Sequence, residues 1–228
     1  MNASTIKNGI NEKSKVSPLL TFFPKSCYHH SELFGMEIAS VARETKTSRN
    51  TIFDISHLRR FTIAGKDATG LVVDIFRCQE PRLFSYVKHG KDGIIGRIAK
   101  NQYLLVDSTD GCMIDHLNQL DVADQKDTIF LRTDLAEIAL LGNTAMSVIE
   151  ELTGLDRSSW VGGEFLPCDL GSTQAIVIPV NPSESLIRIV LDPSDAYYIF
   201  GVLESINKRF GGTKEGATTY ANLKINAD

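Results

Sequence analysis

The feature that most constrains the fold is a weak internal repeat. Residues 60–65 and residues 137–142 each form an apolar run that ends in glycine, and the two glycines lie 77 positions apart. In both copies two polar residues, an alanine and a helix-like segment follow. Glycine permits a turn with positive φ, and Asp67, or Asn143 or Thr144, can cap the helix that follows. The repeat therefore predicts two units in which a strand turns directly into a helix.

The segments behind each copy occur in the same order. After the first copy, residues 84–87 and 102–106 have the pattern of strands, a helix is expected from Asp107 or Ser108, and residues 128–131 are β-rich. After the second copy, residues 175–180 and 185–191 have the pattern of strands. The helix that follows them has Asp192 as N-cap and Pro193 in its first turn, and Lys208 and Arg209 precede two glycines. Its expected apolar face is formed by Tyr198, Val202 and Ile206.

This order, β-α-β-β-α in each half, predicts an α+β fold of two ferredoxin-like split βαβ modules. We expect residues 21–133 to form the first module and residues 134–228 the second, which would end in a loose tail. Residues 1–20 are rich in Asn, Lys and Ser, and we expect them to form a flexible N-terminal tail.

Composition excludes several classes of partner. The net charge of −4 provides no basic surface for nucleic acid or an anionic membrane, and no run of about 20 apolar residues could span a bilayer. The N-terminus lacks the apolar region of a signal peptide, and the four cysteines show no C-x-x-C spacing. We therefore expect a reduced, cytoplasmic protein without nucleic-acid or membrane partners.

Local motifs give no strong catalytic or metal signal. Residues 27–30, Cys-Tyr-His-His, are interpreted as a surface loop, because neighbouring histidines on an extended chain point to opposite faces. In residues 54–57, Asp54 and Ser56 are expected to satisfy turn backbone groups while Ile55 points inward, and a ligand-facing role for His57 is left open. Residues 91–97 match no phosphate-binding loop and predict a hairpin. We therefore expect no metal site.

Two longer stretches carry a family resemblance. Residues 51–61 followed by 63–68 resemble the segment "FDVSHMG…V.GPDA", and residues 139–145 resemble the segment "ALxGPxA". Both segments belong to the folate-binding family of the glycine-cleavage T-protein, an aminomethyltransferase. The similarity extends over about residues 16–206, and it implies the fold of the first two T-protein domains.

The departures from this family decide the functional expectation. Its turn "GGIIDDL", whose second Asp is essential to catalysis, corresponds to residues 92–98, where Arg97 holds that position. Phe84 replaces a family tyrosine, and the pterin-binding segment is shortened to residues 180–188. We expect the fold to lack the family's C-terminal barrel. A guanidinium inverts the local charge, so the resemblance implies no catalytic residue and no aminomethyl transfer by this chain alone.

The shortened form is similar to the gamma subunit of heterotetrameric sarcosine oxidase, through residues 185–188, Pro193 and residues 194–196. This resemblance implies a non-catalytic subunit of a flavin- and tetrahydrofolate-linked N-methyl amine oxidase or demethylase, an oxidoreductase complex of one-carbon metabolism. Its partners would be larger flavoprotein subunits, which would hold the flavin. We expect no firmly bound cofactor in this chain itself.

One alternative is a free-standing folate-binding protein, or an aminomethyltransferase-like enzyme with a degenerate pocket. Arg97 would then pair with a glutamate tail or a substrate carboxylate. For the assembly, the alternative to a hetero-oligomer is a homodimer. A further alternative is an interaction domain without a ligand. The candidate walls of the tetrahydrofolate pocket are His57, Leu58, Phe84, Arg97 and Glu164.

Overall fold

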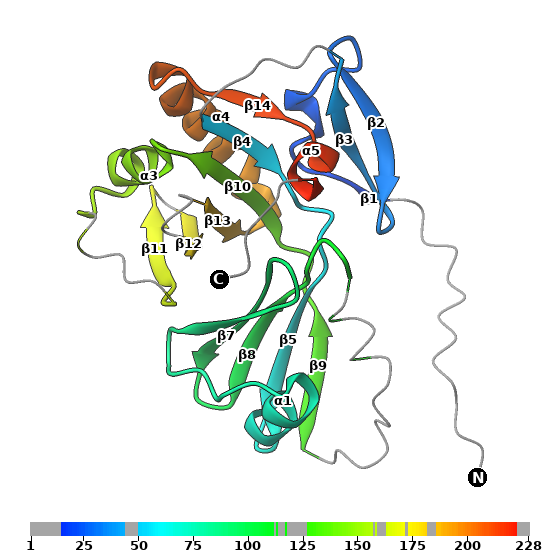
Figure 1. Ribbon diagram of the computed structural model, residues 1–228, viewed down its shortest axis with the longest axis vertical. Helices are drawn as coiled ribbons and strands as arrows, with labels where there is room; N and C mark the ends of the chain where they lie inside the picture. Colours follow the sequence, from blue (N-terminus) through cyan, green and yellow to red (C-terminus); the bar gives the residue numbers. More distant parts are fainter. Residues whose placement is uncertain are drawn as a thin grey trace.

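The computed structural model describes residues 15–43, 50–111, 113, 117, 127–156, 158, 163–171, 173–181 and 186–222 (Figure 1). The strands are β1 (Lys15–Val16), β2 (Tyr28–Leu33), β3 (Met36–Ala42), β4 (Asn50–Asp54), β5 (Arg60–Gly65), β6 (Tyr86–His89), β7 (Gly93–Ala99), β8 (Gln102–Val106), β9 (Thr128–Arg132), β10 (Ala136–Gly142), β11 (Leu166–Leu170), β12 (Thr173–Asn181), β13 (Leu186–Leu191) and β14 (Thr213–Glu215). The helices are η1 (Leu20–Phe22), α1 (Ala68–Phe76), α3 (Ala145–Thr153), α4 (Pro193–Arg209) and α5 (Ala217–Ala221). The predicted α+β class is confirmed.

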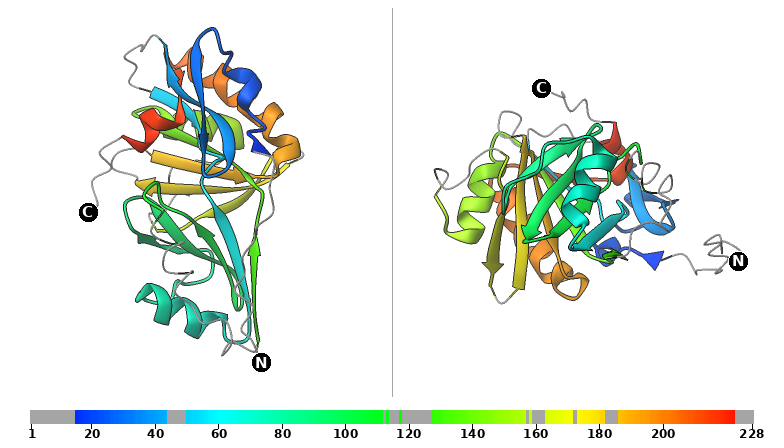
Figure 2. Two further views of the ribbon diagram at one scale, coloured as in Figure 1. Left: turned by 90° about the vertical axis from the view of Figure 1, so that its right-hand side faces the viewer. Right: turned by 90° about the horizontal axis from the view of Figure 1, so that it is seen from below.

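Two large sheets form the centre of the molecule. One has the strand order β11-β12-β13-β10-β4-β14 and the other has the order β6-β7-β8-β5-β9, while β1, β3 and β2 form a small third sheet. Helices α3 and α4 pack on one face of the six-stranded sheet, and α1 packs on the five-stranded sheet. A separate apolar cluster joins the two sheets between these layers. Figure 2 shows α1 at the lower end of the molecule and α4 on the outer side of the upper sheet.

The predicted strand–glycine–helix repeat is present in the structure. Strand β5 leads into α1 and β10 leads into α3. The glycines at the two turns, Gly65 and Gly142, have φ values of 136° and 126°, which side chains other than glycine rarely adopt. At Gly65 an added Cβ would also lie 1.8 Å from the carbonyl oxygen of Asp127. The glycine is therefore required at this turn for both conformation and space.

Helix α4 begins as predicted, and its buried face includes Ile206 of the predicted face but not Tyr198. Asp192 accepts a hydrogen bond from the backbone N–H of Ser194 at 2.9 Å, and Lys208 and Arg209 lie in the last turn. The predicted face is wrong at Tyr198, whose exposed fraction is 65%. The buried positions are Ala196, Ile199, Phe200, Leu203, Ile206 and Asn207. These positions recur at spacings of three and four, which keeps them on one face of the helix. Positions spaced only four apart, as in the expected face, move gradually around the helix axis.

The described parts of the two expected tails are packed into the fold. Residues 15–20 include β1, which pairs in parallel with β3, and Leu19 is fully buried. Near the other end, β14 pairs in parallel with β4, and Tyr220 of α5 is fully buried. The expectation of loose chain is therefore wrong for residues 15–20 and 211–222.

The sheets share segments from both halves of the chain. Strand β4 precedes the first repeat, yet it pairs with β10 in the six-stranded sheet. The chain then passes to the five-stranded sheet through residues 55–59 and returns through residues 133–135. A boundary between residues 133 and 134 would place β4 in the first module, although its partner strands β10 and β14 would belong to the second. This boundary stays a prediction.

Other expectations have mixed outcomes. Residues 27–30 are expected to form a surface loop, but residues 28–30 belong to strand β2, which pairs with β3. Tyr28 is buried, and the pairing shifts register between His29 and His30. The hairpin is confirmed, since β6 and β7 are paired across residues 90–92. Most of the helix expected after Asp107 lies outside the described residues. Within the described ranges, no helix has both the length and the apolar character needed to cross a bilayer.

Candidate functional site

Charged side chains lie in the apolar layer between the two large sheets. Arg60 begins β5, Glu137 lies on β10 and Arg188 lies on β13. The guanidinium of Arg60 donates to Glu137 Oε2 at 2.9 Å, and Arg188 Nε donates to Glu137 Oε1 at 2.5 Å. None of the three residues is more than 3% exposed. One carboxylate therefore bonds two guanidiniums and ties both sheets together.

A second carboxylate, Asp92, lies beside this cluster. Arg188 Nη1 donates to the backbone carbonyl of Asp92 at 2.6 Å, and the side chain of Asp92 accepts from Ser108 Oγ and from the backbone N–H of Thr109, each at 2.8 Å. Burial is the largest single influence on the pKa of Arg188 and lowers it, but the surrounding groups, Glu137 foremost, together outweigh burial and raise it. Tyr220 of α5 closes the cluster, and burial raises the pKa of its hydroxyl. We name these residues (Arg60, Asp92, Glu137, Arg188 and Tyr220) the inter-sheet cluster.

A cavity of about 310 Å³ lies next to the inter-sheet cluster, and His57 and Leu58 line it together with Arg60. The ring of Phe34 is stacked over His57, with centroids 6.0 Å apart and an angle of 4° between the planes. Arg59 lies 4.8 Å from the centroid of the same Phe34 ring. The wall of this cavity thus combines an aromatic ring, a neighbouring cation and a buried imidazole.

His57 is a neutral imidazole at pH 7. Its exposed fraction is 4%, and burial, followed by repulsion from Arg60 and Arg188, lowers its pKa to about 4. Its Nδ1 has no hydrogen-bond partner among the residues that the structure describes. The neighbouring turn matches its prediction, because Ser56 N–H donates to Asp54 Oδ1 at 3.0 Å and Ile55 is fully buried.

The other three predicted pocket residues lie elsewhere. The backbone N–H of Phe84 donates to the carbonyl of Arg97 at 2.9 Å, and Glu164 forms a bridge with Ser85, so their backbones are adjacent. Their side chains have different surroundings. Arg97 Nη1 donates to Glu80 at 2.5 Å, the ring of Phe84 lines an apolar groove, and Glu164 is exposed.

The five predicted residues therefore form two groups. His57 and Leu58 line one cavity, Phe84 lines another, and neither cavity contains Arg97 or Glu164. They do not fit a common folate pocket in the described chain, and their assignment to folate stays a prediction.

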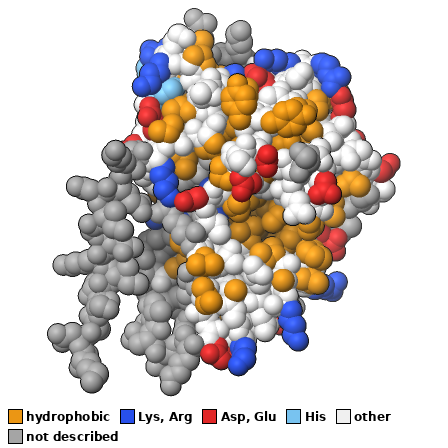
Figure 3. All heavy atoms as spheres, turned by 180° about the vertical axis from the view of Figure 1, so that it is seen from behind, with side chains coloured by type: hydrophobic (Ala, Val, Ile, Leu, Met, Phe, Trp, Pro, Cys, Tyr) orange, Lys and Arg blue, Asp and Glu red, His pale blue; other side chains and the backbone are white. Residues whose placement is uncertain are grey.

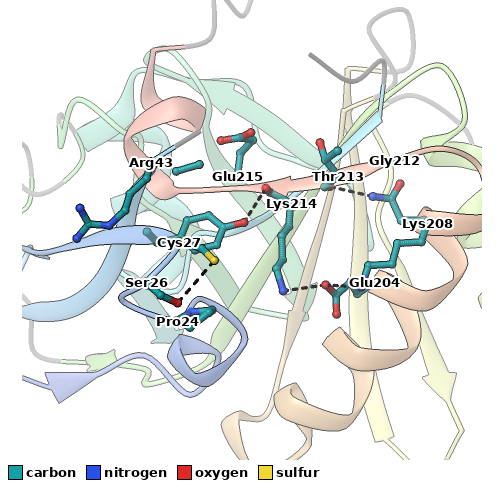
Figure 4. A pocket seen from close by; sticks show the side chains of 13 residues that line it. Pro24, Ser26, Cys27, Arg43, Glu204, Lys208, Gly212, Thr213, Lys214 and Glu215 are labelled. Carbon is teal, nitrogen blue, oxygen red and sulfur yellow. Dashed lines mark hydrogen bonds and ion pairs between the residues drawn. The ribbon is translucent and has the colours of Figure 1, made fainter. Parts of the chain in front are cut away.

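A third cavity, of about 560 Å³, lies between β2, the end of α4 and β14 (Figure 4). Three of its charged groups pair, since Lys208 and Lys214 both reach Glu204, at 3.0 Å and 2.8 Å. The hydroxyl of Tyr28 donates to the carbonyl of Lys214 at 3.1 Å, and burial raises the pKa of Tyr28 to about 12. The ion pair of Lys214 thus joins β14 to α4, and the Tyr28 hydrogen bond joins β14 to β2.

Comparisons with known proteins identify the architecture. No family model matches the sequence, and no curated protein matches it. The crystal structure of glycine cleavage system aminomethyltransferase T from Bartonella henselae superimposes with a TM-score of 0.70 at 15% identity, over 91% of this chain and 60% of that one. The fold is T-protein-like. This confirms the predicted fold, and the chain spans 60% of the length of that aminomethyltransferase.

A second structure with a T-protein-like region is a hetero-oligomer. A chain of heterotetrameric sarcosine oxidase from Corynebacterium sp. U-96, in complex with pyrrole 2-carboxylate, superimposes with a TM-score of 0.58 at 12% identity. The match covers 72% of this chain and 88% of that chain.

Sequence reasoning missed the centre of this T-protein-like fold. Glu137 and Arg188 are each an isolated charge in an otherwise apolar strand, β10 and β13, and that was the available signal. A fully buried charge requires a partner, but the sequence does not say which partner. Chemically, the inter-sheet cluster can hold the sheets together, whereas its carboxylate Glu137 is shielded from solvent and already bonded to two arginines.

Proposed function

We propose that this chain is a non-catalytic, sarcosine oxidase gamma-like subunit of a cytoplasmic, flavin- and tetrahydrofolate-linked N-methyl amine oxidase or demethylase. The observation that carries the proposal is that the carboxylate between the two sheets is buried and already bonded to arginines. The Glu137 carboxylate is fully buried and bonds Arg60 and Arg188. A general acid or base must reach its substrate with a proton to give or take, and this carboxylate cannot do so.

The position of Arg97 supports the same proposal. The resemblance to the T-protein expects a catalytic carboxylate there, but Arg97 is a cation whose guanidinium is bonded to Glu80 and lies 5.9 Å from the Tyr103 ring centroid. A guanidinium cannot act as a base, because the charged group has no free lone pair with which to accept a proton. The chain would thus keep the fold and leave the oxidation to a flavoprotein partner.

The second structural match gives further support. This fold covers 88% of a chain of the heterotetrameric sarcosine oxidase. A chain with this fold in a hetero-oligomeric oxidase is the arrangement that the proposal requires.

The proposal is tested by isolating the protein from its native cells at modest salt. We expect it to elute with larger subunits, to show the visible absorption of bound flavin in constant ratio to protein, and to lose that absorption when an N-methyl amine is added. A colourless chain that elutes alone and supports folate-dependent methylene transfer would refute the proposal.

The cavity beside His57 favours a second candidate, a free-standing folate-binding protein. The parallel Phe34 and His57 rings in its wall are suited to contact a flat heterocycle. Titration of the isolated chain with tetrahydrofolate tests this candidate, with Phe34→Ala expected to weaken binding at least tenfold. Arg97→Ala tests whether the glutamate tail of the folate pairs with Arg97. If it does, the variant should bind tetrahydrofolate more weakly, and if it does not, the affinity should be unchanged.

A further inference from the structure

An apolar groove of about 560 Å³ runs along the junction of the two large sheets. Its walls come from both sheets and from the connections between them, and they include Phe84, Ile98, Leu135, Pro167 and Ile176. Figure 3 shows hydrophobic side chains gathered in a hollow between the upper and lower parts of the molecule. The groove is thus a surface feature that spans the sheet junction.

The groove exposes more apolar surface than the fold itself explains. Ile98, Leu135 and Ile176 pack on the cluster between the sheets but are only partly buried. Phe84, which lines the groove, is 43% exposed, and its chain neighbour Leu83 is 52% exposed. Contiguous apolar surface rimmed by polar residues commonly marks a protein–protein contact, since water is released when a partner covers it.

The charges around the groove define the kind of partner. Among the described residues that line it, the charged ones are Asp169 and Asp192, and none is a lysine or an arginine. Glu164, which precedes the groove residue Phe165, is also exposed. Asp169 is exposed and lies on β11 at the edge of the six-stranded sheet. A complementary surface would place apolar side chains in the groove and Lys or Arg opposite this acidic rim.

We infer that this groove is the surface through which the chain docks on its larger flavoprotein partner, which inserts an apolar anchor flanked by Lys or Arg. The inference rests on the proposed function and adds to it the face of the chain and the chemistry of the contact. A free anionic ligand is a poorer occupant, because the groove has a long apolar wall and its described lining residues include no lysine or arginine.

The first experiment places a photo-crosslinking residue in the intact protein in its native cells. Gln174 is an exposed groove residue and Asp74 is an exposed residue of α1, on the far side of the five-stranded sheet. We expect illumination to join position 174 to the flavoprotein subunit, at a peptide with Lys or Arg beside apolar residues. Position 74 should give no such adduct.

The second experiment reverses one charge. The probe is the set of flavoprotein subunits purified from cells that lack this chain, immobilised on a sensor. Asp169→Lys should lower the association rate constant about threefold at low salt, and the difference should shrink as salt is raised. Asp74→Lys, the same charge change away from the groove, should associate at the rate of the unmodified chain.

The outcomes separate the two levels of the proposal. A flavin-containing complex without an adduct from position 174, and with normal association of Asp169→Lys, would overturn the groove assignment and leave the subunit function standing. An adduct to a second copy, or to another part of the same chain, would also overturn it. A chain that never associates with a flavoprotein would overturn the proposed function.

Discussion

Replacing Glu137 by Gln is the sharpest test of the inter-sheet cluster. The variant keeps the shape of the side chain but removes the charge that balances Arg60 and Arg188, which are 3% and 0% exposed. Removing one partner of a buried ion pair costs roughly 3–5 kcal/mol, because the remaining charge stays buried without compensation. Two guanidiniums lose their partner here, so we expect the free energy of unfolding to fall by about 4 kcal/mol.

Urea unfolding followed by circular dichroism measures this change. With an m-value of ~3 kcal/mol/M, the midpoint should fall by about 1.3 M, and the melting temperature should fall by roughly 8–16 °C. Glu151→Gln is the matched control, because Glu151 pairs with Arg209 at the surface, where the two side chains are 40% and 62% exposed. That change should cost less than about 1 kcal/mol.

A third variant tests the mechanism. Replacing Glu137, Arg60 and Arg188 together by Leu, Leu and Met removes every buried charge of the trio, and it should recover stability to within about 2 kcal/mol of the native chain. If Glu137→Gln were no more destabilising than Glu151→Gln, the carboxylate would not be compensating both arginines, and the reasoning would be refuted.

Three further predictions concern pH and local packing. The pKa of His57 is lowered to about 4 in the folded chain, so its contribution to stability is full above about pH 6.5 and is lost as pH falls toward 4, by about 3 kcal/mol in total. The urea midpoint should therefore fall with pH over this range in the native chain and fall less steeply in His57→Gln. Equal slopes of midpoint against pH in the two proteins would contradict the assignment. Gly216→Ala should lower the free energy of unfolding by about 1–3 kcal/mol, since the new Cβ would lie 2.2 Å from the carbonyl oxygen of Ser40. The control is Gly70→Ala in α1, where the new Cβ would lie in open space. It should raise the free energy of unfolding by about 0.5–1 kcal/mol in the same assay. Asp192→Ala should lower the melting temperature through the loss of about 1 kcal/mol of N-cap stabilisation of α4, and an unchanged temperature would contradict that role.

The parts of the fold that depend on local chemistry could be predicted from the sequence. Gly65 and Gly142 mark the strand-to-helix turns because glycine alone adopts their positive φ at low cost, and Asp192 marks the start of α4 because its carboxylate caps Ser194. The pairing of β4 with β10 and β14 could not be predicted. Strand pairing over such sequence distances depends on which apolar faces meet, and periodicity alone does not identify the partner strand.

The candidate site shows the same limit. His57 and Leu58 lie together because they are adjacent in the chain, but Phe84, Arg97 and Glu164 were grouped with them by family resemblance alone. The structure gives Arg97 a local partner, Glu80, which is 17 residues away and has no counterpart in the motif. Side-chain direction at the end of a hairpin depends on such contacts, and a motif written as single letters does not contain them.

The groove and the inter-sheet cluster belong to one junction. Leu135 lines the groove two positions before Glu137, and the chain enters β10 at the residue between them. On β13, Val190 and Leu191 line the groove two and three positions after Arg188. The buried ion pairs are strong only while water is excluded from their surroundings, because a lower local dielectric strengthens the attraction between opposite charges. A partner that covers the groove would exclude water from the open side of this junction, so docking and the stability of the two-sheet arrangement should reinforce each other.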